Sequence, residues 1–154
     1  MISMEEILMG RAEFNSLPID IQANLITLHS RINVIRKAYA KPMYVNSGLR
    51  RLQDQPANAA SKSKHLIGAA IDLRDDDNGT LWKWCLKNLD LMAKVGLWLE
   101  DPRWTHGAGN WMHFQIIPPR SGKRVFVPSS AKPSAPDLWD GNYDRSLDSK
   151  NQPI

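Results

Sequence analysis

The chain has few cysteines and no long apolar run, and its first residues do not follow the pattern expected of a secretory leader. Its 154 residues include one cysteine, Cys85, so an internal disulfide and a four-cysteine zinc site are both excluded. It contains no run of about eighteen apolar residues, so we expect no membrane-spanning helix. The N-terminus carries acidic side chains early and has no basic segment before a continuous apolar stretch, which argues against a secretory signal peptide. The sequence therefore predicts a soluble protein that would need another route to act outside the cytoplasm.

The charge balance says little about partners. Lysine and arginine number 20 against 16 acidic residues, a formal net charge of +4. This excess favours an anionic partner such as nucleic acid, a membrane surface or an acidic cell-wall polymer, and solubility explains it equally well. The basic residues are scattered, without the interleaved aromatic residues that single-strand binders use. We therefore expect neither nucleic acid nor a membrane as the partner.

Hydrophobic periodicity predicts a mixed helical and stranded chain of one domain. Apolar residues recur every three or four positions from Ile21 to Tyr39, and a second helical pattern covers 80–95, where Gly96 is placed as its stop. Residues 51–64 are polar and rich in turn formers, so we expect a surface loop there. Short strands are expected at 43–46, 69–73, 97–99, 111–117 and 124–128.

The last part of the chain differs in composition from the rest. Residues 129–154 are rich in proline, serine, aspartate and asparagine and show no periodicity. Such a segment wraps over a surface or stays mobile. We therefore predict a domain over 1–128 with an extended tail over 129–154. The domain is expected to be α+β, with a small antiparallel sheet and helices packed on one face.

Two of the predicted strands each place one metal-competent side chain on their less hydrophobic face. Strand alternation puts Asp72 opposite the apolar Ile71 and Leu73, and it separates His113 from Met112 and Phe114 in the same way. If these strands are neighbours, Asp72 and His113 converge. Small residues at 68 and 70 leave room for a third side chain, His65, to fold back towards them.

Two imidazoles and one carboxylate form a ligand set typical of catalytic zinc, which keeps a fourth position for water. A water at such a site becomes a nucleophile near neutral pH. From spacing alone, the alternative is that the three residues are unrelated: a surface histidine, a helix-capping acid and a core histidine. The sequence pattern leaves both interpretations open.

The segment around His65 resembles a known metal motif. The pattern S-x-H-x-x-G-x-A-x-D is matched by Ser63, His65, Gly68, Ala70 and Asp72. It is similar to the first metal motif of the D-alanyl-D-alanine carboxypeptidase and dipeptidase family of zinc peptidases, which includes phage L-alanyl-D-glutamate endolysins. The upstream S-G-x-R at 47–50 and the W-M-H-F at 111–114 resemble further segments of that family, in the same order.

The resemblance, which covers 43–117, implies a set of roles. The metal ligands would be His65, Asp72 and His113, the cofactor Zn²⁺, and the metal would lie in a cleft on the sheet face away from the helices. Arg50 and Ser63 would bind substrate. A guanidinium fork also suits planar carboxylates, in which peptidoglycan stem peptides are rich.

One position departs from the family pattern. The family places an acidic general base three residues before the last histidine, where this chain has Asn110. An amide cannot accept that proton at neutral pH. Three alternatives follow: Glu100 or Asp101 serves as the catalytic base, His106 does so, or the domain binds zinc without efficient hydrolysis.

The function predicted from the sequence is zinc-dependent hydrolysis of a peptide bond in peptidoglycan stem peptides. The chain would be a phage endolysin or a virion-associated peptidase, present in the host cytoplasm before release to the cell wall, or in the virion. The alternative is a catalytically weak or inactive zinc-binding module of a phage particle, with 129–154 docking it to other virion proteins.

Overall fold

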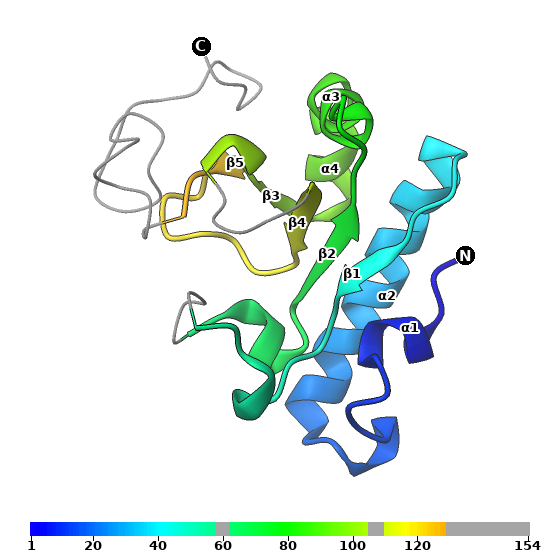
Figure 1. The fold of residues 1–154 in the computed structure, drawn as a ribbon, viewed down its shortest axis with the longest axis vertical. Helices are drawn as coiled ribbons and strands as arrows, with labels where there is room; N and C mark the ends of the chain where they lie inside the picture. The colour runs from blue at the N-terminus through cyan, green and yellow to red at the C-terminus, as the bar shows by residue number, and fades with distance from the viewer. Residues whose placement is uncertain (58–61, 105–109, 129–154) are drawn as a thin grey trace.

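The structure is a computed structural model that describes residues 1–57, 62–104 and 110–128. The predicted tail at 129–154 lies outside the described residues. The fold is α+β, as the sequence predicts (Figure 1). Its α-helices are α1 (Met4–Leu8), α2 (Ile19–Tyr39), α3 (Thr80–Lys87) and α4 (Leu89–Val95). Short 3₁₀ turns are η1 (Phe14–Ser16), η2 (Leu52–Asp54), η3 (Lys64–Ile67) and η4 (Pro102–Trp104).

Five strands form one sheet in the order β1-β2-β4-β3-β5. Their bounds are β1 (Val45–Ser47), β2 (Ala70–Arg74), β3 (Trp98–Glu100), β4 (Trp111–Gln115) and β5 (Val125–Phe126). The expectation of a purely antiparallel sheet is wrong at one edge, because β5 pairs with β3 in parallel. After β4 the connection 116–124 crosses to the far side of β3, and β5 then runs in the same direction as β3. The sheet is therefore mixed.

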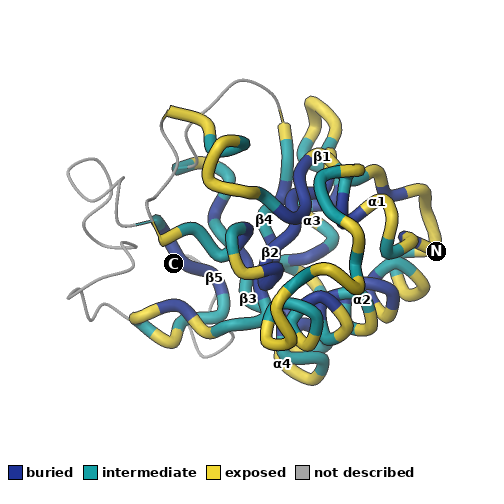
Figure 2. The backbone as a smooth tube through the Cα atoms, turned by 90° about the horizontal axis from the view of Figure 1, so that it is seen from below, coloured by how far each residue is buried: buried dark blue, intermediate teal, exposed yellow. Residues whose placement is uncertain are grey.

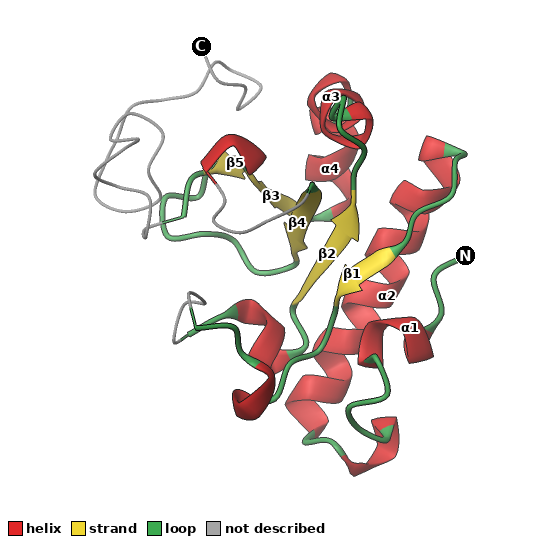
Figure 3. Ribbon diagram, viewed as in Figure 1, coloured by secondary structure: helices red, strands yellow, loops and turns green. Residues whose placement is uncertain are grey.

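The core lies between one face of the sheet and the helices, which Figure 3 shows along that side of the strands. The long helix α2 begins just before the predicted Ile21 and ends at the predicted Tyr39. Figure 2 shows the central strands among the buried parts of the chain. The helix α2 and the strands β2, β3 and β4 supply many of the buried side chains: Leu25, Leu28, Ile32, Ile35, Ile71, Leu73, Leu99, Met112 and Phe114. The other helices also contribute to this core.

The single helix predicted over 80–95 is wrong, because the chain breaks at Asn88 into α3 and α4. Asn88 leaves the helical region with φ −124° and ψ 31°. Its side-chain amide donates to the carbonyl of Trp84 at 2.8 Å, and its backbone N–H donates to Cys85 at 2.9 Å. Asparagine competes with helical hydrogen bonds in this way, which explains why periodicity alone did not predict the break.

The N-terminal segment forms a helix that the sequence analysis did not predict. Ser3 and Glu6 make a reciprocal capping box at the start of α1. Asn33 of α2 then holds the chain before α1, because its side-chain amide accepts from and donates to the backbone of Ile2. The segment is thereby joined to the core. None of the described helices has both the length and the apolar character that crossing a membrane requires.

Candidate metal centre

The three side chains predicted as metal ligands lie together. The Asp72 Oδ1 atom lies 2.9 Å from His113 Nδ1 and 3.2 Å from His65 Nε2. The two imidazole nitrogens are 3.3 Å apart, and the ring planes are inclined by 65°. One atom from each residue thus points into the same small space. The group could hold a metal ion.

The sheet places two members of this group. Asp72 of β2 pairs directly with His113 of β4, and Ser47 of β1 pairs with Asp72 from the other side. Direct partners in neighbouring strands have Cβ atoms about 4.5–5.5 Å apart and share one face. Because Ile71 and Phe114 face the core, Asp72 and His113 face the opposite side of the sheet. The prediction that these two strands are neighbours in the sheet is confirmed.

The turn η3 places His65. The hydroxyl of Ser63 accepts the His65 backbone N–H at 3.4 Å, which starts the turn. Gly68 ends it in the left-handed region with φ +70°. A Cβ at Gly68 would lie 2.8 Å from the Leu25 side chain of α2, so both the backbone conformation and the close packing favour glycine here. His65 is 2% exposed and its ring reaches the sheet from outside the strands.

The hydrogen bond of His65 to a carbonyl determines which ring nitrogen faces the group. His65 Nδ1 lies 2.8 Å from the carbonyl oxygen of Gly48. A carbonyl oxygen only accepts, so Nδ1 carries the proton. In a neutral imidazole the lone pair is then on Nε2, which faces Asp72 and His113. This is the arrangement in which a histidine binds a metal through Nε2.

A guanidinium holds the second oxygen of the carboxylate. Arg50 Nη2 donates to Asp72 Oδ2 at 2.9 Å, and Arg50 Nε donates to the Ser47 hydroxyl at 2.9 Å. The Asp72 side chain is 6% exposed and that of Arg50 13%. Arg50, which the sequence predicts as a substrate-binding residue, therefore also orients the predicted ligand Asp72.

The electrostatics of the group keep the carboxylate of Asp72 ionised and the imidazole of His65 neutral. Burial alone would raise the pKa of Asp72, but the neighbouring imidazoles of His65 and His113 outweigh burial, and the pKa lies well below its usual range. Burial lowers the pKa of His65, and it outweighs the negative charge of Asp72, which acts to raise that pKa. These protonation states are the ones that metal ligands need.

Glu100 lies on the same face as the group. In the β3–β4 pair Leu99 lies opposite Phe114, and the register continued by one residue brings Glu100 level with His113. Burial lowers the pKa of His113, but the hydrogen bond and charge of Asp72 together with the charge of Glu100 raise it above its ordinary value. The charge of Glu100 also acts on Arg50, whose pKa is lowered chiefly by burial. Ser47, Asp72, His113 and Glu100 thus form one row across β1, β2, β4 and β3.

Asp101 has different surroundings. It is 1% exposed, and its carboxylate accepts two hydrogen bonds from the guanidinium of Arg103, at 3.0 Å from Nε and 2.6 Å from Nη2. The backbone N–H of Arg103 also donates to it at 3.0 Å. Of the two acids predicted as catalytic, Asp101 is held in a structural ion pair at the end of β3, whereas Glu100 shares the face of the metal group.

The remaining predicted positions have separate surroundings. The amide of Asn110 donates to the Asp77 carboxylate at 2.8 Å, and both residues line a cavity of about 270 Å³ beside the start of α3. Ser63 caps η3, and its predicted substrate contact stays a prediction, as does the cleft around the metal group. His106 lies outside the described residues.

Two residues of the site escaped sequence reasoning. Gly48 contributes only a backbone carbonyl, and no sequence signal marks such a contact. Gln115 lies on the same face of β4 as His113, and the sequence analysis gave it no role. Its amide oxygen lies 3.2 Å from His113 Nε2. The sequence signal that could have identified Gln115 is its position: it is polar, and it lies two residues from a predicted ligand on the same face of the strand.

Comparison with protein-family models, curated proteins and solved structures returned no significant match.

Proposed function

We propose that the chain is a zinc-dependent peptidase that hydrolyses a peptide bond in the stem peptides of peptidoglycan. The observation that carries this proposal is the group of two histidines and one aspartate whose ligand atoms lie within 4.8 Å of one another, with Glu100 on the same face of the sheet. The resemblance of 63–72 to the first metal motif of the carboxypeptidase family supports it.

Zinc is the metal that suits the dimensions of the group. In a tetrahedron with ligand distances of roughly 2.0–2.1 Å, neighbouring ligand atoms are about 3.3–3.4 Å apart. The three ligand atoms lie 2.9, 3.2 and 3.3 Å from one another, close to that edge length. Two nitrogens and one carboxylate oxygen are also a common zinc set, and they leave a fourth position.

The proposed reaction divides the roles among the residues of the row. Bound zinc would polarise the scissile carbonyl and lower the pKa of the attacking water. Glu100 would accept the proton of that water as the new C–O bond forms, and would pass it to the leaving nitrogen as the C–N bond breaks. Arg50 would hold Asp72 and use its remaining N–H groups to orient the peptide.

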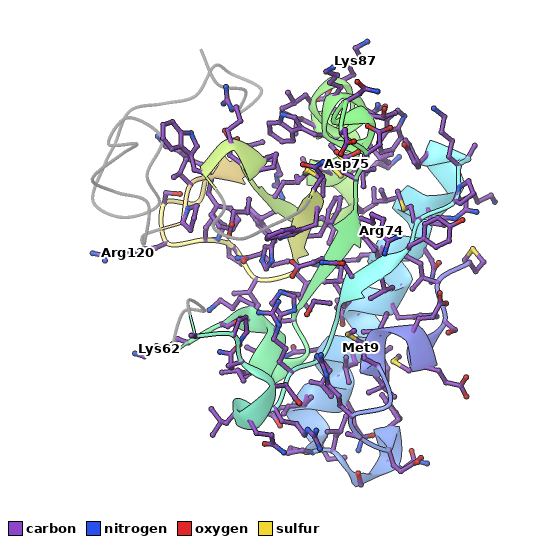
Figure 4. The ribbon with its side chains drawn as sticks, in the orientation of Figure 1. Met9, Lys62, Arg74, Asp75, Lys87 and Arg120 are labelled. Carbon is purple, nitrogen blue, oxygen red and sulfur yellow. The ribbon has the colours of Figure 1, made fainter. Side chains whose placement is uncertain are left out.

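The charge of the molecule fits an anionic substrate. Stem peptides are rich in carboxylates, and the net charge of +4 favours their approach. Figure 4 shows the labelled Lys62 and Arg120 projecting outward from the same side of the molecule, and both are exposed. We further propose that the chain acts as a phage endolysin or a virion-associated peptidase, and these basic residues would assist its approach to the wall.

A second candidate function rests on Asn110. This position carries the general base in the family that the chain resembles, and here its amide is bound to Asp77. If Glu100 does not replace the missing acid, the domain would be a zinc-binding structural module of a phage particle. Its tail at 129–154 would then contact neighbouring virion proteins.

The test is to measure zinc content and stem-peptide cleavage on the same preparation. The zinc-loaded chain is incubated with muropeptides, and the products are identified by mass spectrometry. We expect cleavage, and we expect Glu100→Gln to lower its rate about 10²–10⁴-fold with zinc content unchanged. Glu13→Gln, at an exposed glutamate outside the site, is the matched control. Bound zinc with intact stem peptides would overturn the peptidase and favour the structural module.

A further inference from the structure

We infer that Gln115 is a positioning residue that holds His113 in the tautomer and orientation in which Nδ1 binds the metal; this rests on the proposed zinc site. Gln115 lies two residues after His113 in β4, on the same face of the sheet. Its Oε1 atom is 3.2 Å from His113 Nε2. The ring nitrogen on the other side, Nδ1, is the atom that faces Asp72.

The direction of the Gln115 amide follows from its second contact. Its Nε2 donates to the backbone carbonyl of Ile117 at 2.6 Å. Turning the amide over would place Oε1 against that carbonyl, and two acceptors would then face each other. Oε1 is therefore the atom towards His113, and it can only accept. His113 Nε2 must carry the proton, which leaves the lone pair on Nδ1.

Burial makes this arrangement hard to replace. Gln115 is 4% exposed, and its backbone lies in the centre of the sheet between Ala70 and Trp98. A buried amide without hydrogen-bond partners is costly, so both hydrogen bonds of the Gln115 side chain are retained in the folded chain. His113 is thus held by a fixed acceptor, as His65 is held by the carbonyl of Gly48. Each imidazole thus turns one nitrogen to a fixed acceptor and the other nitrogen towards the same point.

The inference predicts a specific loss of zinc affinity. Partners that orient a ligating histidine typically contribute 10–100-fold to metal affinity. We expect Gln115→Leu, which fills the same space without an acceptor, to raise the zinc dissociation constant by about that factor. Gln22→Leu, at a glutamine that bonds only the backbone of Leu17, is the matched control.

Two measurements on the full chain test the inference independently of catalysis. The zinc dissociation constants are obtained by competition with a chromophoric chelator, and the ¹⁵N shifts of the imidazoles are recorded in the zinc-loaded protein. We expect a protonated Nε2 and an unprotonated Nδ1 for His113. Zinc affinity unchanged in folded Gln115→Leu, or a His113 protonated at Nδ1 in the unaltered chain, would overturn the inference. If Gln115→Leu fails to fold, the tautomer in the unaltered chain decides alone.

The outcomes also separate this inference from the proposed peptidase. A chain that binds zinc, loses affinity in Gln115→Leu and leaves muropeptides intact would refute the peptidase and support the role of Gln115. A chain that cleaves muropeptides while Gln115→Leu binds zinc normally would support the peptidase and refute the role of Gln115.

Discussion

Asp72 and His113 face each other across the β2–β4 pair, with Oδ1 and Nδ1 2.9 Å apart. The same pairing that places these two side chains together also places Ile71 against Phe114 on the core face. A shift of the register by one residue would turn all four side chains to the wrong faces. The group of His65, Asp72 and His113 is therefore part of the architecture of the sheet, and a metal bound there would be linked to the stability of the fold.

Zinc is expected to raise the melting temperature. A ligand that binds only the folded chain adds about 2.7 kcal/mol of stability at a concentration a hundredfold above its dissociation constant. For a chain of this size that corresponds to roughly 5–11 °C. Scanning fluorimetry with zinc and with a chelator measures the shift. His113→Ala should abolish it and His29→Ala should not. Equal melting temperatures with and without zinc would contradict the proposed site.

Gly48 is expected to tolerate no side chain. A Cβ at this position would lie 2.0 Å from the carbonyl oxygen of Ile7, so the backbone must move, and with it the carbonyl that holds His65. We expect Gly48→Ala to destabilise the fold by roughly 1–3 kcal/mol and to weaken zinc binding. Gly122→Ala meets open space, and its positive φ costs about 1–2 kcal/mol, so it should leave zinc affinity unchanged. Denaturant unfolding and chelator competition measure both quantities; normal zinc binding in Gly48→Ala would refute this role.

Substitution of Asp101 is expected to lower the stability of the fold, whereas substitution of its neighbour Glu100 is expected to lower the cleavage rate. Its buried carboxylate is held by Arg103, whose side chain is 53% exposed, so solvent weakens the charge contribution. Asp101→Asn replaces an ionised acceptor with an amide and should cost about 1–3 kcal/mol, with little change in the cleavage rate per folded molecule. Thermal unfolding and the muropeptide assay measure the two effects. A stable Asp101→Asn without activity would instead place Asp101 in the reaction.

The sequence predicted most of the strands, the helix α2 and the grouping of His65, Asp72 and His113, because these depend largely on local patterns. Alternation in β2 and β4 separates polar from apolar side chains, and the α2 stripe repeats every three to four residues. Nothing in these patterns specifies that β5 joins β3 in parallel, because that depends on where the connection 116–124 leads. Apolar periodicity likewise does not predict the local side-chain hydrogen bond from Asn88 to the carbonyl of Trp84, which accompanies the break between α3 and α4.

The surroundings of the ligands were less predictable than the ligands themselves. Sequence spacing treats Glu100 and Asp101 alike because they are adjacent. Their side chains leave β3 in opposite directions, and the structure separates them into a residue beside His113 and a residue paired with Arg103. Likewise, His65 contacts the backbone carbonyl of Gly48. Every residue has such a carbonyl, so the sequence does not mark this partner. Such distinctions require the paired strands and turns to be in place.

Arg50 gives the sharpest test of how the carboxylate ligand is held. Its guanidinium reaches two acceptors at once, with Nε on Ser47 and Nη2 on Asp72, both at 2.9 Å. A lysine ammonium is a single point charge and cannot span both. We expect Arg50→Lys to weaken zinc binding by about tenfold, because Asp72 loses its fixed orientation. The adjacent Arg51 supplies a matched control, since its partner is Asp54 and its side chain is 48% exposed.

Arg51→Lys should therefore bind zinc as the unaltered chain does. Chelator competition on the three proteins gives the affinities, and muropeptide kinetics give KM and kcat separately. A raised KM with unchanged zinc affinity in Arg50→Lys would show that the guanidinium serves the substrate alone. Weakened zinc binding with a matching fall in cleavage at limiting zinc, reversed by excess zinc, is the result expected of a residue that acts through Asp72.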